Sequence, residues 1–164
     1  MKIGYVTAEF SEEFKKSIRE WSLVIPKEEI VSVEINGKME GGNVTNDLHL
    51  TLFYGFDDEK INKKELLKFL GEKALRELRI EGLRTFSVPQ YKCNILYLKI
   101  DGKNMLEKIH DSLKKFPYFE KFQNNKFIPH LTIAYIKDSF DISLLKLPQK
   151  MNKVDIKELM YHSK

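Results

Sequence analysis

One internal repeat constrains the fold of this chain more than any other sequence feature. The segment H-L-T-L-F-Y at residues 49–54 returns as H-L-T-I-A-Y at residues 130–135, 81 residues later in a chain of 164. Each copy follows an alternating, β-forming stretch and then an amphipathic stretch with helical spacing. The order strand, helix, strand, helix, strand therefore occurs twice. This predicts a single domain, residues 1–164, made of two related lobes.

The element pattern predicts lobes of about residues 1–90 and about residues 91–164. The first begins with a strand over Ile3–Phe10 and a helix that is N-capped by Ser11 and ends before Pro26. A strand over Ile95–Asp101 and a helix around residues 105–113 are their counterparts in the second lobe. Further segments are expected after the repeats: a helix over 63–78, a strand over 84–88, a short helix over 142–147 and a strand over 154–161. The predicted class is α+β, a bilobal pseudo-twofold fold with two antiparallel sheets facing a central cleft and helices outside.

The first lobe carries about 11 extra residues ahead of its repeated motif. Within them, Asn36-Gly37 is typical of a two-residue β-hairpin turn, and Gly41-Gly42 predicts a loop.

Strand alternation assigns side chains of the repeats to a cleft face. Residues i and i+2 of a strand share a face, which groups His49, Thr51 and Phe53 in the first copy and His130 with Thr132 in the second. The same rule leaves polar residues of the upstream strands opposite their helix-covered faces, namely Tyr5 in the first lobe and Tyr97 and Lys99 in the second. A pseudo-twofold arrangement would bring these stripes together across one cleft.

Two histidines and two threonines around one cleft suit chemistry at phosphorus. Imidazoles titrate near neutral pH, so one can act as general base and the other as general acid. Threonine hydroxyls can donate hydrogen bonds to the oxygens of a phosphate. A metal site would need more histidine or carboxylate ligands, and we therefore expect neither a metal nor another cofactor.

Composition narrows the setting of the protein. Hydrophobic residues make up 42% of the chain, and no apolar run approaches the length of a membrane span. Cys93 is the single cysteine, which excludes an intrachain disulfide. We expect a cytoplasmic protein without membrane association. The formal net charge of +4 favours anionic partners only weakly.

The paired H-x-T motifs, about 80 residues apart in a bilobal chain of this size, resemble those of the two-histidine (2H) phosphoesterase superfamily. That group includes RNA 2′,5′-ligases and 2′,3′-cyclic nucleotide phosphodiesterases. The longer segments H-L-T-L-F-Y-G-F and F-I-P-H-L-T-I-A-Y are most similar to those of small bacterial and phage members. The resemblance implies acid–base roles for His49 and His130, phosphate contacts from Thr51 and Thr132, and no requirement for a metal.

These observations together predict a phosphodiesterase that acts on nucleotide or RNA phosphodiesters. Expected substrates are 2′,3′-cyclic phosphates, 2′,5′-linked oligonucleotides or cyclic oligonucleotides, and the protein is expected to be a monomer. Tyr5, Tyr97, Lys99 and Phe53 are candidate substrate contacts. The alternatives are RNA 2′,5′-ligase activity, or an inactive nucleic-acid-binding module that uses the same cleft.

The remaining two histidines are expected to be structural. His110 lies between apolar positions of a predicted helix, and His162 lies near the C-terminus, where exposure is expected.

Overall fold

The computed structural model describes residues 1–164, with the exception of the Lys150 side chain. The strands are β1 (Ile3–Phe10), β2 (Ser32–Ile35), β3 (Lys38–Gly41), β4 (Leu50–Asp57), β5 (Arg79–Val88), β6 (Cys93–Asp101), β7 (His130–Lys137) and β8 (Ile156–Ser163). The helices are α1 (Glu12–Ser22), α2 (Lys63–Gly71) and α3 (Met105–Leu113), and short 3-10 turns occur between these elements.

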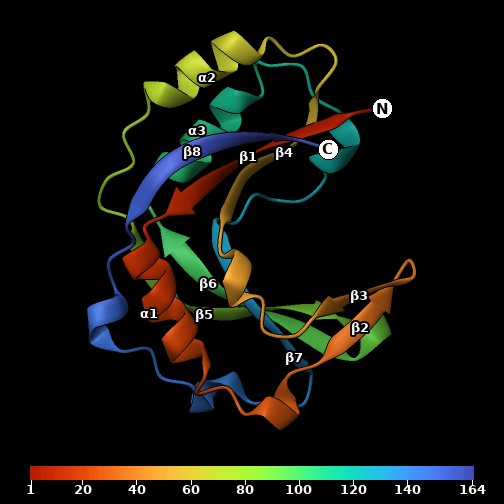
Figure 1. The fold of residues 1–164 in the computed structure, drawn as a ribbon, viewed down its shortest axis with the longest axis vertical. Helices are drawn as coiled ribbons and strands as arrows, with labels where there is room; N and C mark the ends of the chain where they lie inside the picture. Colours follow the sequence, from red (N-terminus) through yellow and green to blue (C-terminus); the bar gives the residue numbers. More distant parts are fainter.

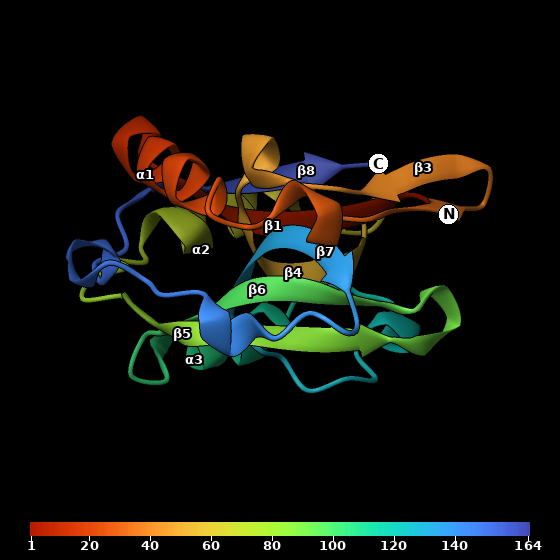
Figure 2. The ribbon, with the colours of Figure 1, turned by 90° about the horizontal axis from the view of Figure 1, so that it is seen from below.

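Two antiparallel three-stranded sheets form the body of the protein. The first sheet has the order β4-β1-β8 and the second has the order β5-β6-β7. Figure 2 shows β1 and β8 in one layer and β5 and β6 in the other. The predicted bilobal α+β class is confirmed. The predicted hairpin is also present, as β2 and β3, with positive φ at both Asn36 and Gly37.

The two chain halves exchange their last strands, which corrects the predicted lobe boundary near residue 90. Strand β5 belongs to the first half but pairs with β6, and β8 belongs to the second half but pairs with β1. Only a short turn separates β5 from β6, and Val88 pairs with Cys93 on either side of it. Such a tight connection favours a hairpin, so a boundary at residue 90 divides one structural unit.

The helices pack their apolar faces against the sheets. Ser11 caps α1 by accepting a hydrogen bond from the Phe14 amide, and Phe14, Ile18 and Trp21 are buried. In Figure 1, α2 and α3 lie above the first sheet, where they pack against β8 and β4, respectively. Within the described residues, no helix has both the length and the hydrophobicity that a membrane crossing needs.

Two predicted helices are shorter than expected. Helix α2 ends at Gly71 rather than near residue 78, and the 142–147 segment contains only a 3-10 turn at Ile142–Leu144. Glycine favours termination of α2. Leu78 instead lies in extended chain, where its carbonyl accepts a hydrogen bond from the Val154 amide and its side chain is buried.

The segment that precedes each repeated motif pairs with the motif strand of the other lobe. The amides of Val31 and Val44 donate to the carbonyls of Tyr135 and Ile133 in β7. The Phe119 amide donates to the Gly55 carbonyl in β4. The chain entering one motif is therefore held directly against the other motif.

A buried carboxylate fastens the C-terminal strand to the end of β4. Asp58 accepts hydrogen bonds from the hydroxyls of Tyr161 and Ser163, and Lys63 forms an ion pair with it at 3.0 Å. The hydrogen bond from Tyr161 contributes most to lowering the pKa of Asp58 to about 2. This carboxylate is only 6% exposed. It is therefore expected to stabilise the fold in its ionised form.

We expect Asp58→Asn to lower the free energy of unfolding by about 1–3 kcal/mol at pH 7. The substitution replaces a charged acceptor by a neutral one, which weakens the hydrogen bonds from Tyr161 and Ser163. A carboxylate with a depressed pKa contributes stability above its ordinary pKa of 3.8, and this contribution is lost as the pH falls toward 2. Thermal melts of the two proteins should therefore converge over that range. The exposed neighbour Glu59→Gln serves as a control with little effect. A gap that stays constant down to pH 2 would contradict this account.

Candidate active site

The two motif histidines are held by the same local hydrogen bond. Nδ1 of His49 lies 2.9 Å from the carbonyl oxygen of Asp47, and Nδ1 of His130 lies 2.6 Å from that of Ile128. A carbonyl can only accept, so Nδ1 carries the proton in both rings. Nε2 is therefore the atom that each ring can offer to a substrate.

A β-bulge shapes each motif strand in the same way. Thr51 pairs with Thr7 and Phe53 pairs with Val6, so Leu52 is the extra residue in β4. Ile133 occupies the same position in β7, between Thr132, which pairs with Tyr97, and Ala134, which pairs with Leu96. No hydrogen bond to the Thr51 or Thr132 hydroxyl is found within the described part of the chain. Both hydroxyls are available to a ligand.

The structure brings the two motifs together at one site. Strands β4 and β7 contact each other, and Thr51 and His130 line the same groove, which has a volume of about 550 Å³. His49 lies near enough to His130 for its positive charge to affect the pKa of that ring.

The two imidazoles differ in their surroundings. Burial lowers the pKa of His130 below its ordinary 6.5, the hydrogen bond to Ile128 opposes this, and the charge of His49 lowers the pKa further. The His49 side chain is 38% exposed and its Nδ1 lies 3.8 Å from a carboxylate oxygen of Asp47. At neutral pH, His130 is thus neutral, with a free lone pair on Nε2.

Tyr97 and Lys99 lie beside His130, as the alternation predicts, but both already have partners. The Tyr97 ring is stacked on Phe86 at 4.1 Å and meets His130 edge-on at 5.3 Å, and it is only 6% exposed. Lys99 pairs in register with His130 and forms an ion pair with Glu81 at 3.1 Å. Tyr97 therefore supports the His130 ring and leaves little surface for a ligand.

Phe53 is among the residues that line the groove, but its side chain is almost completely buried. The bulge at Leu52 interrupts the alternation, so Phe53 turns inward, where it is 1% exposed and stacks on Phe56. Tyr54 instead shares the cleft face with Thr51 and packs against Tyr5, its cross-strand partner.

Tyr5 lies on the cleft face but is not the counterpart of Tyr97. Thr7 pairs with Thr51 as Tyr97 pairs with Thr132, so Thr7 is the equivalent residue.

His162 belongs to the cleft, contrary to the expectation that it is exposed at the C-terminus. Its ring stacks on Tyr5 at 4.6 Å, and its Nε2 lies 2.8 Å from the Thr7 hydroxyl. That hydroxyl donates to Glu9 and so accepts from His162, which places a proton on Nε2 of His162. The predicted strand ended at Tyr161 and so did not include His162. In the longer strand, alternation places residues 158, 160 and 162 on the cleft face.

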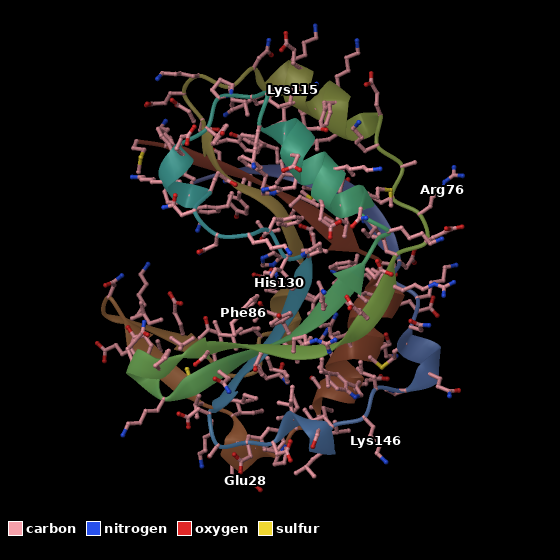
Figure 3. The ribbon with its side chains drawn as sticks, turned by 180° about the vertical axis from the view of Figure 1, so that it is seen from behind. Glu28, Arg76, Phe86, Lys115, His130 and Lys146 are labelled. Carbon is pink, nitrogen blue, oxygen red and sulfur yellow. The ribbon has the colours of Figure 1, made fainter. Side chains whose placement is uncertain are left out.

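The sequence reading also missed the groove beside His130. Phe86 meets the His130 ring edge-on at 5.2 Å, and Figure 3 shows the two side by side. Residues of the segment 122–128, just before the second motif, also line this groove. Its sequence, F-Q-N-N-K-F-I, mixes aromatic and polar residues, a composition that could have indicated a ligand-binding segment.

Few side chains in this cleft are suited to hold a metal. Among the described residues, no group of three or more histidine, cysteine, aspartate and glutamate side chains has the arrangement of a metal site. The donor set at the paired motifs consists of two imidazoles and two hydroxyls.

Comparisons with known proteins agree with this geometry. The family model described as the 2′-5′ RNA ligase superfamily matches residues 41–156, which include both H-x-T motifs. The chain belongs to this superfamily. The resemblance to the two-histidine phosphoesterases is thereby confirmed.

A curated relative and several solved structures are similar to this chain. "Putative phosphoesterase GK0864" of Geobacillus kaustophilus is 33% identical over 90 residues, which cover 52% of this chain and 50% of that protein. The match thus spans about half the length of the curated relative. E. coli LigT in complex with 3′-AMP aligns over 99% of this chain and 87% of LigT, with 14% identity and a TM-score of 0.54. A structure described as a phosphoesterase gives a TM-score of 0.58 at 15% identity, covering 99% and 88% of the two chains. At these identities the structures show a shared fold.

We expect His130 to titrate below the ordinary histidine pKa of 6.5 in the free protein, and His49→Gln to raise its pKa. Burial disfavours the imidazolium form, and His49→Gln removes a nearby positive charge without emptying its position. A ¹H–¹³C NMR titration in phosphate-free buffer measures both values, and the exposed Asp111→Asn serves as a control. A His130 pKa above 6.5, or one that His49→Gln lowers, would contradict the assigned surroundings.

Proposed function

We propose that the chain is a phosphodiesterase that cleaves nucleotide phosphodiesters without a metal ion. The observation that carries the proposal is the pair of histidines with identical Nδ1 anchors, each followed by a free threonine hydroxyl. Membership of the superfamily and the shared fold support a phosphoesterase-like or ligase-like function. E. coli LigT has been solved with 3′-AMP and with phosphate, which favours a nucleotide phosphate as the ligand here.

The surroundings of the two rings suggest how the roles are divided. Neutral His130 takes a proton on Nε2 from the attacking water or ribose hydroxyl as the new P–O bond forms. Protonated His49 gives its Nε2 proton to the leaving oxygen as the old P–O bond breaks. The hydroxyls of Thr51 and Thr132 donate to the two non-bridging oxygens, where negative charge increases in the transition state. The proton count balances, since one ring gains what the other loses.

Hydrolysis is favoured over ligation because water can reach the site. The 38% exposed His49 side chain lies at an open position, and bulk water is at about 55 M. Candidate substrates are 2′,3′-cyclic phosphates, 2′,5′-linked oligonucleotides and cyclic oligonucleotides. A monomer acting in the cytoplasm remains our expectation. An inactive binding module is disfavoured because both histidines and both threonines are present.

We expect a panel of these three substrate classes, assayed in EDTA, to yield a substrate whose turnover depends on the paired motifs. His49→Ala and His130→Ala should each lower kcat by about 10²–10⁴, the usual contribution of an acid–base group. Thr51→Ala and Thr132→Ala should cost about 10–10³, as loss of one oxyanion donor does. The matched variants Thr51→Ser and Thr132→Ser keep the hydroxyl and should retain most activity.

Near wild-type turnover by either histidine variant would end the two-histidine mechanism. Complete loss of activity in EDTA, restored by one divalent ion, would show that catalysis depends on a metal.

A further inference from the structure

The groove that contains Thr51 and His130 is also lined by aromatic side chains. Its volume of about 550 Å³ lies within the range of small-ligand sites, and Thr51 and His130 are among the residues that line it. Phe86, Phe122 and Phe127 are among the residues that line it. A ligand whose phosphate lies at the paired motifs would therefore extend into an aromatic pocket.

A nucleobase fits this combination better than an aliphatic group. Aromatic side chains stack on the flat face of any base, whatever its identity. The exposed Lys126 at the groove adds a positive charge that is compatible with a nucleotide. The pocket and the phosphate contacts are continuous, as a base and a phosphate joined by one ribose require.

His110 supplies a polar atom to this pocket. Its Nδ1 lies 2.6 Å from the carbonyl of the bulged residue Leu52, so Nδ1 carries a proton and donates. Its ring lies flat against Phe127, with centroids 4.2 Å apart and planes 4° from parallel. Nε2 has no partner among the described residues and is not sealed from solvent. His110 lines the groove, and Nε2 is its ring nitrogen that no described protein group occupies.

While the His110 ring is neutral, Nε2 carries no proton and acts as a hydrogen-bond acceptor. Burial lowers the pKa of His110 and the charge of Lys114 lowers it further, whereas the bond to Leu52 and the charge of Asp111 oppose this. The groove therefore presents an acceptor to the edge of any base that enters it. The exocyclic amino groups of adenine and cytosine are donors, whereas uracil has a carbonyl at the corresponding position.

We propose that this groove binds the base of the substrate nucleotide and that His110 selects adenine or cytosine, which carry an amino group at C6 and C4, respectively. The inference rests on the proposed function for the position of the phosphate. It adds a specificity-determining residue outside the paired motifs.

Calorimetric binding to the wild-type protein tests the proposal without requiring turnover. The ligands are 3′-AMP, purine riboside 3′-phosphate, which lacks only the amino group, 3′-CMP, 3′-UMP and inorganic phosphate. We expect 3′-AMP to bind about three- to tenfold more tightly than its amino-free analogue, the scale of one net hydrogen bond. The same preference is expected for 3′-CMP over 3′-UMP. All nucleotides should bind more tightly than phosphate.

His110→Phe keeps an aromatic ring against Phe127 and removes the acceptor, so the preference for amino-bearing bases should fall to about one. Lys108→Gln, at an exposed position on α3, should leave the preference unchanged. Equal binding of phosphate and every nucleotide would overturn the base site. Equal binding of 3′-AMP and its amino-free analogue by the wild-type protein would overturn selection by His110, even if His110→Phe failed to fold. Discrimination without turnover of any phosphodiester would instead refute the proposed function and leave this inference intact.

Discussion

The site depends on one repeated hydrogen bond, which Nδ1 of each motif histidine donates to the carbonyl two residues before it. This bond fixes the tautomer of both rings and leaves Nε2 of each for the substrate. Because the bond is the same in both lobes, the surroundings alone make the rings different. Burial lowers the pKa of His130, whereas His49 is partly exposed. Two copies of one motif can thus take opposite roles at a single phosphorus atom.

The exchange of strands and covering segments explains why the two copies form one site. Each sheet contains a strand from the other half of the chain, and the segment ahead of each motif is bonded to the opposite motif strand. The bulges at Leu52 and Ile133 complete this symmetry. The backbone carbonyl of each bulged residue needs a hydrogen-bond donor. His110 donates to the carbonyl of Leu52, and the Val44 amide donates to that of Ile133. His110 therefore also supports the first motif strand.

Much of the fold was predictable because the repeat, the caps and the period-2 patterns are local signals. The strand over Ile3–Phe10, the Ser11 cap and the Asn36-Gly37 turn are all present in the structure. The bulges were not predictable from alternation, since an extra residue in a strand pairing changes no side-chain type, and the burial of Phe53 follows from one of them. The strand exchange depends on long-range pairing, which no short window of sequence encodes. His162 and Phe86 come to the cleft only through that exchange.

The central claim is that both motifs act as one unit on one phosphate. Steady-state kinetics of the double variant His49→Ala/His130→Ala, beside both single variants on the best substrate, tests it most directly. Residues that share one transition state give grossly non-additive losses. The account predicts that the double variant is little worse than the poorer single variant. Losses in kcat that multiply, as two independent sites would give, would contradict it.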